Sequence, residues 1–235
     1  MSTWRLPIHL VGIRDSFRRA ARRDVGARLP PRLVEALEAL RREELPYCTA
    51  GASQVREFLA PSAGQRLLDV GCGADLIVHR LDRWPLVFHG VDLCEDLLVE
   101  TRRFASRNRV SLGGLTLAHA AALPYRDGAF DLLVCIGVLE YGPLAYARQA
   151  LEEMARVLRP GGRAVVDLPN ASHPRIDAVR EIEAARGRVI HVLDEAGVLA
   201  AARRHLEVWS VDASRVMTRL CLVKRRRRRR GARAR

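Results

Sequence analysis

Apolar residues along this chain follow two different spacings. In roughly the first 60 residues they recur at helical intervals, as in Leu10, Ile13, Phe17 and Ala21, which is the pattern of an amphipathic helix. This spacing predicts three helices, near 10–25, 32–44 and 52–60. Proline cannot donate the hydrogen bond that continues a helix, so we expect the second helix to stop at Pro46.

From residue 66 onward, short apolar runs alternate with helical patterns, as expected of βαβ units and a mainly parallel sheet. The apolar runs predict strands near 66–70, 87–91, 115–119, 130–136 and 162–167. The helical patterns predict helices near 75–83, 95–107, 144–158 and 193–204. No helix separates the last two strands, 206–211 and 216–223, so they should pair as an antiparallel hairpin at one side of the sheet.

The length of 235 residues suits one domain with appendages. We expect a helical cap over residues 1–60, the α/β domain over residues 61–223 and a disordered tail over residues 224–235. No apolar run approaches the roughly 20 residues that span a bilayer, which predicts a soluble protein without a transmembrane segment. The five cysteines include no C-x-x-C pair. This argues against disulfides and a zinc site, and it favours the cytoplasm.

The net charge of +13 is concentrated at the C-terminus. Residues 224–235 (KRRRRRRGARAR) hold nine of the 40 basic residues and no acid, so the other 31 basic and 27 acidic residues leave only +4. The tail is either incidental to the chemistry or a contact for nucleic acid, an anionic membrane or an acidic partner. The Arg-rich residues 1–23 have the composition of a transit peptide, but arginine is enriched throughout the chain, so we treat them as mature protein.

A glycine turn follows the first predicted strand. Asp69 and Val70 lead into Gly71-Cys72-Gly73, and a helix is expected to open directly afterwards. Glycine lets a ligand approach the backbone, and the start of a helix offers free N–H groups to negative charge. A lone G-x-G is weak evidence, because the same pattern also forms plain strand-to-helix turns.

A carboxylate farther along the chain strengthens the ligand interpretation. Asp92 ends the second predicted strand, nineteen residues beyond Gly73. In dinucleotide-binding folds an acid at about this distance accepts hydrogen bonds from the ribose hydroxyls. Asp92 is alternatively the N-cap of the helix at 95–107, but together with the glycine turn we favour the ribose role.

Four segments carry a family resemblance: LLDVGCG, GVDL, AALPYRDGAFDLLVCIGVLEYG and EEMARVLRPGGRAVVDLPN. In this order they resemble the class I S-adenosylmethionine (SAM)-dependent methyltransferases, and in character the small-molecule enzymes of ubiquinone and menaquinone biosynthesis. A nicotinamide dehydrogenase would share the glycine turn but not the two later segments. The resemblance implies a Rossmann-like, doubly wound α/β fold with seven strands, SAM as the cofactor, and methyl transfer to a small-molecule acceptor.

The resemblance also assigns ten residues to the cofactor: Asp69, Gly71, Cys72, Gly73, Asp92, Leu93, His119, Ala120, Ile136 and Gly137. Asp69, Gly71 and Gly73 would line the methionine part of SAM. Asp92 would receive the ribose hydroxyls, and Leu93 would lie against adenine. Ile136 and Gly137 would border the site of methyl transfer. By the same resemblance, Asp131 has a structural role at the start of the fourth strand, and Pro160-Gly161-Gly162 is an architectural turn into the fifth.

Two positions depart from the family pattern. Asp75 stands where relatives usually have a third glycine, and His119 stands where they usually have an acid for the adenine amino group. Asp75 would either stabilise the start of the helix or crowd the ligand. His119 can accept a hydrogen bond only through an unprotonated ring nitrogen. We therefore expect weakened SAM binding rather than none.

Methyl transfer needs no single catalytic residue, because SAM carries its own leaving group and the protein chiefly positions the acceptor. Ligands of α/β sheets lie outside the carboxyl ends of strands. The candidates expected there are Glu140, Tyr141, Asn170 and His173. His173 is the best-suited base, since the ordinary pKa of histidine is about 6.5. It is equally well interpreted as an exposed loop histidine.

Two other functions stay open from the sequence. The departures at Asp75 and His119 are compatible with a catalytically silent partner or regulatory subunit, and the basic tail is compatible with a nucleic-acid methyltransferase. Against the latter, the chain lacks the Asn-Pro-Pro-Tyr segment of amino-methylating DNA enzymes and the Pro-Cys pair of cytosine-C5 enzymes. A small-molecule acceptor is favoured. The pattern indicates neither its identity nor the oligomeric state.

Overall fold

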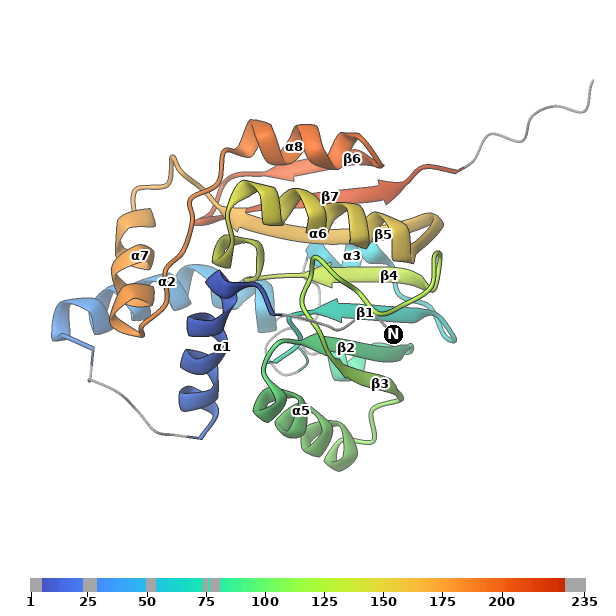
Figure 1. Ribbon diagram of the computed structural model, residues 1–235, viewed down its shortest axis with the longest axis horizontal. Helices are drawn as coiled ribbons and strands as arrows, with labels where there is room; N and C mark the ends of the chain where they lie inside the picture. Colours follow the sequence, from blue (N-terminus) through green and yellow to red (C-terminus); the bar gives the residue numbers. More distant parts are fainter. Residues whose placement is uncertain (1–5, 23–28, 50–53, 74–75, 77–80, 227–235) are drawn as a thin grey trace, which may run out of the picture.

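The structure is a computed structural model that describes residues 6–22, 29–49, 54–73, 76 and 81–226. Within these residues, one seven-stranded sheet has helices on both faces (Figure 1). The strands are β1 (Arg66–Val70), β2 (Val87–Asp92), β3 (Leu112–Leu117), β4 (Phe130–Cys135), β5 (Leu158–Pro169), β6 (Leu206–Asp212) and β7 (Met217–Lys224). The helices are α1 (Ile8–Ala21), α2 (Pro31–Thr49), α3 (Gln54–Leu59), α5 (Glu95–Arg107), α6 (Leu144–Val157), α7 (Ile176–Ala185) and α8 (Glu195–Arg203), with short 3-10 helices η1 (Leu81–Arg83) and η2 (Leu139–Tyr141).

The strand order is β3-β2-β1-β4-β5-β7-β6. Adjacent strands from β3 to β5 are parallel, whereas β7 is antiparallel to both β5 and β6. The order reverses direction between β1 and β4, which is the switch point where α/β sheets bind ligands beyond the carboxyl ends of their strands. The predicted doubly wound α/β fold and its terminal hairpin are confirmed.

Neighbouring residues in the central strands point to opposite faces of the sheet, and both faces are covered. Leu68 and Leu133 belong to the core beneath α6 and α8, while Leu67 and Leu132 belong to the core beneath α3 and α5. All four side chains are almost fully buried. Burial on both faces explains why these strands are continuous apolar runs rather than alternating ones.

The N-terminal helices attach to different parts of the domain. α1 packs beside α5 and η2, near the carboxyl ends of the parallel strands, whereas α2 packs against α7 and α3 against β5 (Figure 1). Leu33 and Leu40 of α2 share a small core with Ile176 and Ile182 of α7. None of the described helices is both long enough and apolar enough to cross a membrane.

The prediction that a helix stops at Pro46 is wrong, because α2 continues to Thr49. A proline inside a helix costs about 3 kcal/mol, since it removes one hydrogen bond and its ring meets a preceding carbonyl group. The packing of Leu33 and Leu40 against α7 stabilises the same helix and offsets this cost.

The third strand lies earlier than predicted, at Leu112–Leu117 rather than 115–119. The difference comes from Gly113 and Gly114, which look like loop residues in the sequence. The ring of His89 on β2 occupies the space beside Gly113, where any side chain would overlap it. The strand therefore requires glycine here.

The fifth strand begins earlier than predicted. The sequence predicts Pro160-Gly161-Gly162 as a turn before the strand, but these residues lie inside β5. The register opposite β4 jumps from Phe130↔Leu158 to Leu132↔Arg163, so four residues of β5 oppose one of β4. The segment is a bulge within the strand.

Most of the helix predicted at 75–83, including Asp75, lies outside the described residues, and its end forms η1. Most of the tail predicted at 224–235 also lies outside them.

Candidate functional site

A cavity of about 370 Å³ opens beyond the carboxyl ends of β1, β2 and β4. Its described lining is Leu10, Phe17, Val70, Gly71, Gly73, Val91, Asp92, Leu93, Leu97, Ala118, His119, Ala120, Ile136, Gly137, Val138, Tyr141, Tyr146, Glu183, Arg186 and Arg188. Eight of the ten residues expected at the cofactor are among them. The cavity therefore gathers the glycine turn, the acid of the second strand and the loop after the fourth.

The glycine turn is fastened to β2 by hydrogen bonds. The backbone N–H groups of Gly71 and Cys72 both donate to the carbonyl oxygen of Val91, over 2.7 and 3.1 Å. Gly71 has a φ of +84°, and a side chain here would overlap Val138. Only glycine satisfies both conditions without strain. The turn thus forms a backbone surface along the cavity.

The Asp92 carboxylate closes the same corner of the cavity. One of its oxygens accepts from the N–H of Gly73 at 3.0 Å and the other from the N–H of Cys94 at 2.8 Å. Burial raises the pKa of Asp92 to about 6, although the hydrogen bonds from Cys94 and Gly73 act in the opposite direction. Each oxygen retains acceptor capacity, so ionised Asp92 can receive further hydroxyl donors from the cavity.

Asp69 and Cys72 lie outside the cavity lining. Both are fully buried. The sulfur of Cys72 packs against Gly90 of β2, where an added Cβ would lie 2.5 Å from it. The side chains of Asp69 and Cys72 are therefore buried within the fold, whereas Gly71 and Gly73 line the cavity.

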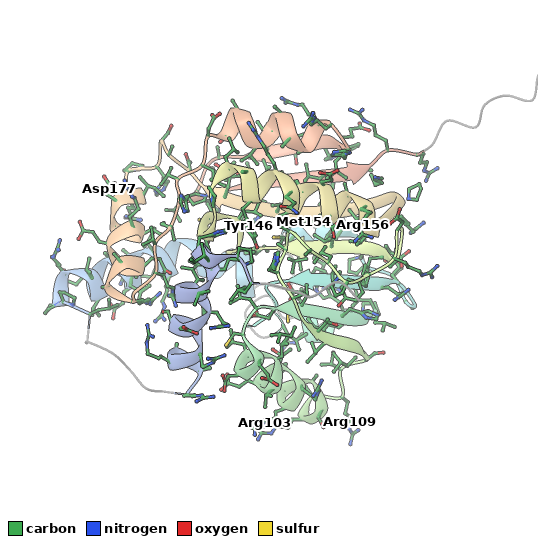
Figure 2. The ribbon with its side chains drawn as sticks, in the orientation of Figure 1. Arg103, Arg109, Tyr146, Met154, Arg156 and Asp177 are labelled. Carbon is green, nitrogen blue, oxygen red and sulfur yellow. The ribbon has the colours of Figure 1, made fainter. Side chains whose placement is uncertain are left out.

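The imidazole of His119 lines the cavity. It is buried, and its ring centroid lies 6.1 Å from that of Tyr146 on α6, the residue labelled in Figure 2. Burial, followed by the charge of His9, lowers the pKa of His119. The ring is therefore neutral near pH 7 and able to accept a hydrogen bond through one nitrogen.

The loop after β4 is held in place from β5. The N–H of Gly137 donates to the buried carboxylate of Asp167 at 2.8 Å. Ile136 and Val138 flank this bond and line the cavity. Asp167 thereby fixes the wall of the cavity that follows the fourth strand.

Of the four catalytic candidates, the cavity includes Tyr141 alone. Glu140 is buried outside the lining, and its backbone oxygen accepts from the N–H of His191 at 2.6 Å. The Asn170 side-chain amide donates to the backbone oxygens of Ala213 and Arg215, both at 2.9 Å. Asn170 therefore binds the segment after β5 to the loop between β6 and β7.

His173, the expected base, belongs to the turn before α7. Its Nδ1 accepts from the N–H of Arg175 at 3.2 Å, and its backbone oxygen accepts from the N–H of Ile176 at 3.1 Å. The described cavity lining does not include it. This position fits a turn-forming histidine better than a general base.

Asp131 has contacts of a structural kind. One carboxylate oxygen accepts from the N–H of Arg66 at 2.8 Å, and the other pairs with Arg159. These bonds join the starts of β1, β4 and β5. Asp75, the other acid singled out in the sequence, lies outside the described residues.

The sequence did not single out several residues at the far end of the cavity. Phe17 comes from α1, Tyr146 from α6, and Glu183, Arg186 and Arg188 from α7 and the segment after it. For Glu183, however, the sequence does contain a signal that could have identified it. It follows Ile176 by seven residues on the apolar face of α7, where a charge indicates a buried partner.

Comparison with known proteins agrees with this geometry. Residues 68–166 match the family model described as a methyltransferase domain. Over 123 residues, the chain is 38% identical to a ubiquinone/menaquinone biosynthesis C-methyltransferase of Roseobacter denitrificans, covering 48% of each chain. It is also 36% identical over 133 residues to the methyltransferase GfsG of Streptomyces halstedii, covering 52% of this chain and 46% of that one. The chain thus spans about half the length of these curated relatives.

Solved structures share the fold at low sequence identity. A magnesium protoporphyrin IX methyltransferase from Synechocystis, crystallised with S-adenosylhomocysteine (SAH), has a TM-score of 0.65 and 16% identity, covering 92% of this chain and 99% of that one. A geranyl diphosphate C-methyltransferase from Streptomyces coelicolor has a TM-score of 0.58 and 18% identity, covering 86% of each. These matches show that the chain shares the fold of methyltransferases of known structure, and that residues 68–166 form a methyltransferase domain.

Proposed function

We propose that the protein is an enzyme that transfers a methyl group from SAM to a small-molecule acceptor. One observation carries the proposal. A single cavity at the switch point of the sheet brings together Gly71, Gly73, Asp92 and Gly137, which come from three separate sequence segments. Nothing in a purely structural role requires these residues to face a common open space.

The near end of the cavity fits a nucleoside. Asp92 offers carboxylate oxygens to ribose hydroxyls, and Leu93 and Ala118 provide apolar contacts for a flat base. His119 is neutral near pH 7, because burial lowers its pKa, and can accept from an exocyclic amino group. His119 would thus replace the carboxylate usual in the family, with a weaker hydrogen bond because the acceptor is uncharged.

The chemistry follows from what the cofactor supplies and what the protein arranges. Bound SAM would supply a methyl group on a positively charged sulfur, ready for transfer to a nucleophile. The loop of Ile136, Gly137 and Val138 would form the wall beside the transfer site, held by Asp167. Phe17 and Tyr141 would orient the acceptor and keep water away from it.

The size of the cavity supports a small acceptor. Its volume of about 370 Å³ lies within the range of about 300–1,000 Å³ that is usual for small-molecule sites. The curated relatives named as quinone-biosynthesis methyltransferases are in keeping with an acceptor of this class.

The proposal is tested by incubating the protein with SAM that carries a trideuterated methyl group and with a small-molecule extract. Mass spectrometry should find a metabolite in which hydrogen is replaced by the labelled methyl group, and Asp92→Asn should reduce its formation. SAH binding without any labelled product would instead favour the catalytically silent alternative.

A further inference from the structure

Two arginines and one glutamate form a polar cluster at the far end of the cavity. Glu183 lies near the end of α7, and Arg186 and Arg188 follow it closely. All three line the cavity, and Glu183 and Arg188 are more than nine-tenths buried. The hydroxyl of Tyr141 donates to the Glu183 carboxylate at 3.0 Å. This end of the cavity is therefore polar, unlike the apolar wall at Leu93.

The arginine donors exceed what Glu183 can use. Arg188 donates to Glu183 through Nε and through Nη2, the latter at 3.0 Å, and Arg186 donates through Nη1, also at 3.0 Å. Among the described residues, Nη1 of Arg188 and Nε and Nη2 of Arg186 have no hydrogen-bond partner. Several N–H groups of two guanidinium ions remain available at the cavity wall.

At the far end of the cavity, the lining itself carries more positive than negative charge. The cavity wall carries two guanidinium ions and the carboxylate of Glu183 at this end, a net positive charge. Burial opposes ionisation of Glu183, but the hydrogen bond and charge of Arg188 outweigh it and lower the pKa of Glu183. The carboxylate therefore stays ionised and serves to fix the arginines. Buried Glu140 lies outside the lining, but its charge helps to raise the pKa of Arg188 and offsets part of the positive charge at this end.

Aromatic rings complete the same end. The rings of Phe17 and Tyr141 meet edge to face, with centroids 5.7 Å apart, and the guanidinium of Arg188 lies over Phe17 at 4.4 Å. This stacking fixes the plane of Arg188, which is the condition for paired hydrogen bonds to a carboxylate. This end of the cavity thus combines the flat apolar rings of Phe17 and Tyr141 with the oriented N–H donors of Arg188.

Resting on the proposed methyl transfer, we propose that this end of the cavity is the acceptor subsite and that Arg186 and Arg188 bind a carboxylate on a flat, aromatic acceptor. Glu183 and Phe17 act as positioning residues that hold Arg188. The assigned ligand class is an aromatic carboxylate, with its anionic group at the arginines and its ring beside Phe17 and Tyr141.

The test uses the full-length protein saturated with SAH, titrated calorimetrically with benzoate and with benzamide, its uncharged counterpart of similar shape. Benzoate should bind about tenfold more tightly or better, as expected for charge-assisted hydrogen bonds. Arg186→Gln should abolish this preference while leaving the affinity for SAH unchanged. The matched control is Arg180→Gln on the same helix, where Arg180 pairs with Asp177 and both side chains are exposed.

Equal affinity of the wild-type protein for benzoate and benzamide would by itself overturn the proposal. A loss of SAH affinity in Arg186→Gln would also overturn it, by placing the arginine on the carboxylate of the cofactor. An equal loss of preference in Arg180→Gln would show only general charge attraction, and would count against the subsite. A wild-type protein that fails to bind SAH contradicts the proposed function itself, a result separate from these three.

Discussion

Asp92 joins the two parts of the proposed nucleoside site. Its carboxylate accepts from Gly73 of the turn and from Cys94 before α5, and its remaining acceptor capacity faces the cavity. Burial at this position disfavours the charged form, so the ability of the site to accept ribose hydroxyls depends on pH near neutrality.

We predict that SAH affinity falls as the pH is lowered through 6. Burial raises the pKa of Asp92 to about 6, and the protonated carboxyl loses its charge and part of its acceptor capacity. The dissociation constant should be steady above about pH 7 and rise by up to about tenfold per pH unit below 6. Calorimetry in a buffer series measures this, and Asp92→Asn should remove the dependence. A constant affinity from about pH 8 to about pH 5 would refute this assignment to Asp92.

Single residues differ in how well the sequence reveals them. Gly71, Gly73 and Asp92 could be predicted because their roles depend on chain order and on a fixed distance between two strands. Phe17 and Arg188 could not, because their approach to the cavity depends on how α1 and α7 pack. His173 looked suitable by residue type, but its local hydrogen bonds use it in a turn.

At the scale of elements, the glycine turn after β1 is the feature that most constrains the site. Its backbone is bound to β2 through Val91, and its open side faces the cavity. A change in the turn should therefore alter both folding and ligand binding.

Gly71→Ala should destabilise the protein more than Gly64→Ala. Both glycines have positive φ, at +84° and +79°, so alanine is strained at either position by about 1–3 kcal/mol. A side chain at position 71 would also overlap Val138, whereas nothing lies within 4 Å of one at position 64. Urea unfolding compares the two variants. Equal losses of stability in the two variants would contradict this prediction, because the overlap with Val138 would then add nothing to the destabilisation.

The cap helix α1 offers a second comparison at this scale. Ser16 donates to the backbone oxygen of Arg186 at 2.6 Å, and Arg18 and Arg22 pair with Asp96 at a half-exposed position. Ser16→Ala should lower the free energy of unfolding by about 1–3 kcal/mol, because a part-buried carbonyl loses its donor. Asp96→Asn should lower it by less than about 1 kcal/mol. The reverse order in chemical denaturation would contradict this account of how α1 is held.

The two strands that sequence patterns misplaced, β3 and β5, both contain residues that usually interrupt strands. Gly113 in β3 and Pro160-Gly161-Gly162 in β5 are strand breakers by local preference, yet both lie in strands. The reason in β3 is a neighbouring side chain, His89, that occupies the missing volume, and in β5 it is a bulge against β4. Such cross-strand contacts are not contained in a local pattern, whereas the buried apolar runs of β1 and β4 are.

Across the whole molecule, the cavity and the end of the last strand, β7, lie at opposite ends of the sheet. The cavity lies at the carboxyl ends of the parallel strands, near α1 and α7. Because β7 is antiparallel to β5, Val223 pairs with Arg163 toward the start of β5, at the opposite end of the sheet (Figure 1). The last described strand, β7, therefore runs away from the end of the sheet at which the cavity lies.

Deletion of residues 227–235 should leave SAH affinity unchanged within about twofold. The end of β7 lies at the end of the sheet opposite the cavity, and screening at physiological salt limits charge effects to about 8 Å. Calorimetry of the shortened protein checks this. A marked loss of affinity would favour a role for the tail at the site, as the nucleic-acid alternative requires.

The proposed methyl transfer requires the cavity beside Asp92 to bind the nucleoside of SAM. The most direct measurement is a calorimetric titration of the wild-type protein, Asp92→Asn and the control Asp96→Asn with SAH. We predict saturable binding to the wild type and to Asp96→Asn, and affinity weaker by about tenfold or more in Asp92→Asn, since a hydrogen bond to a charged group contributes about 1.5–3 kcal/mol. No binding at millimolar SAH, or equal affinity in all three proteins, would contradict the account.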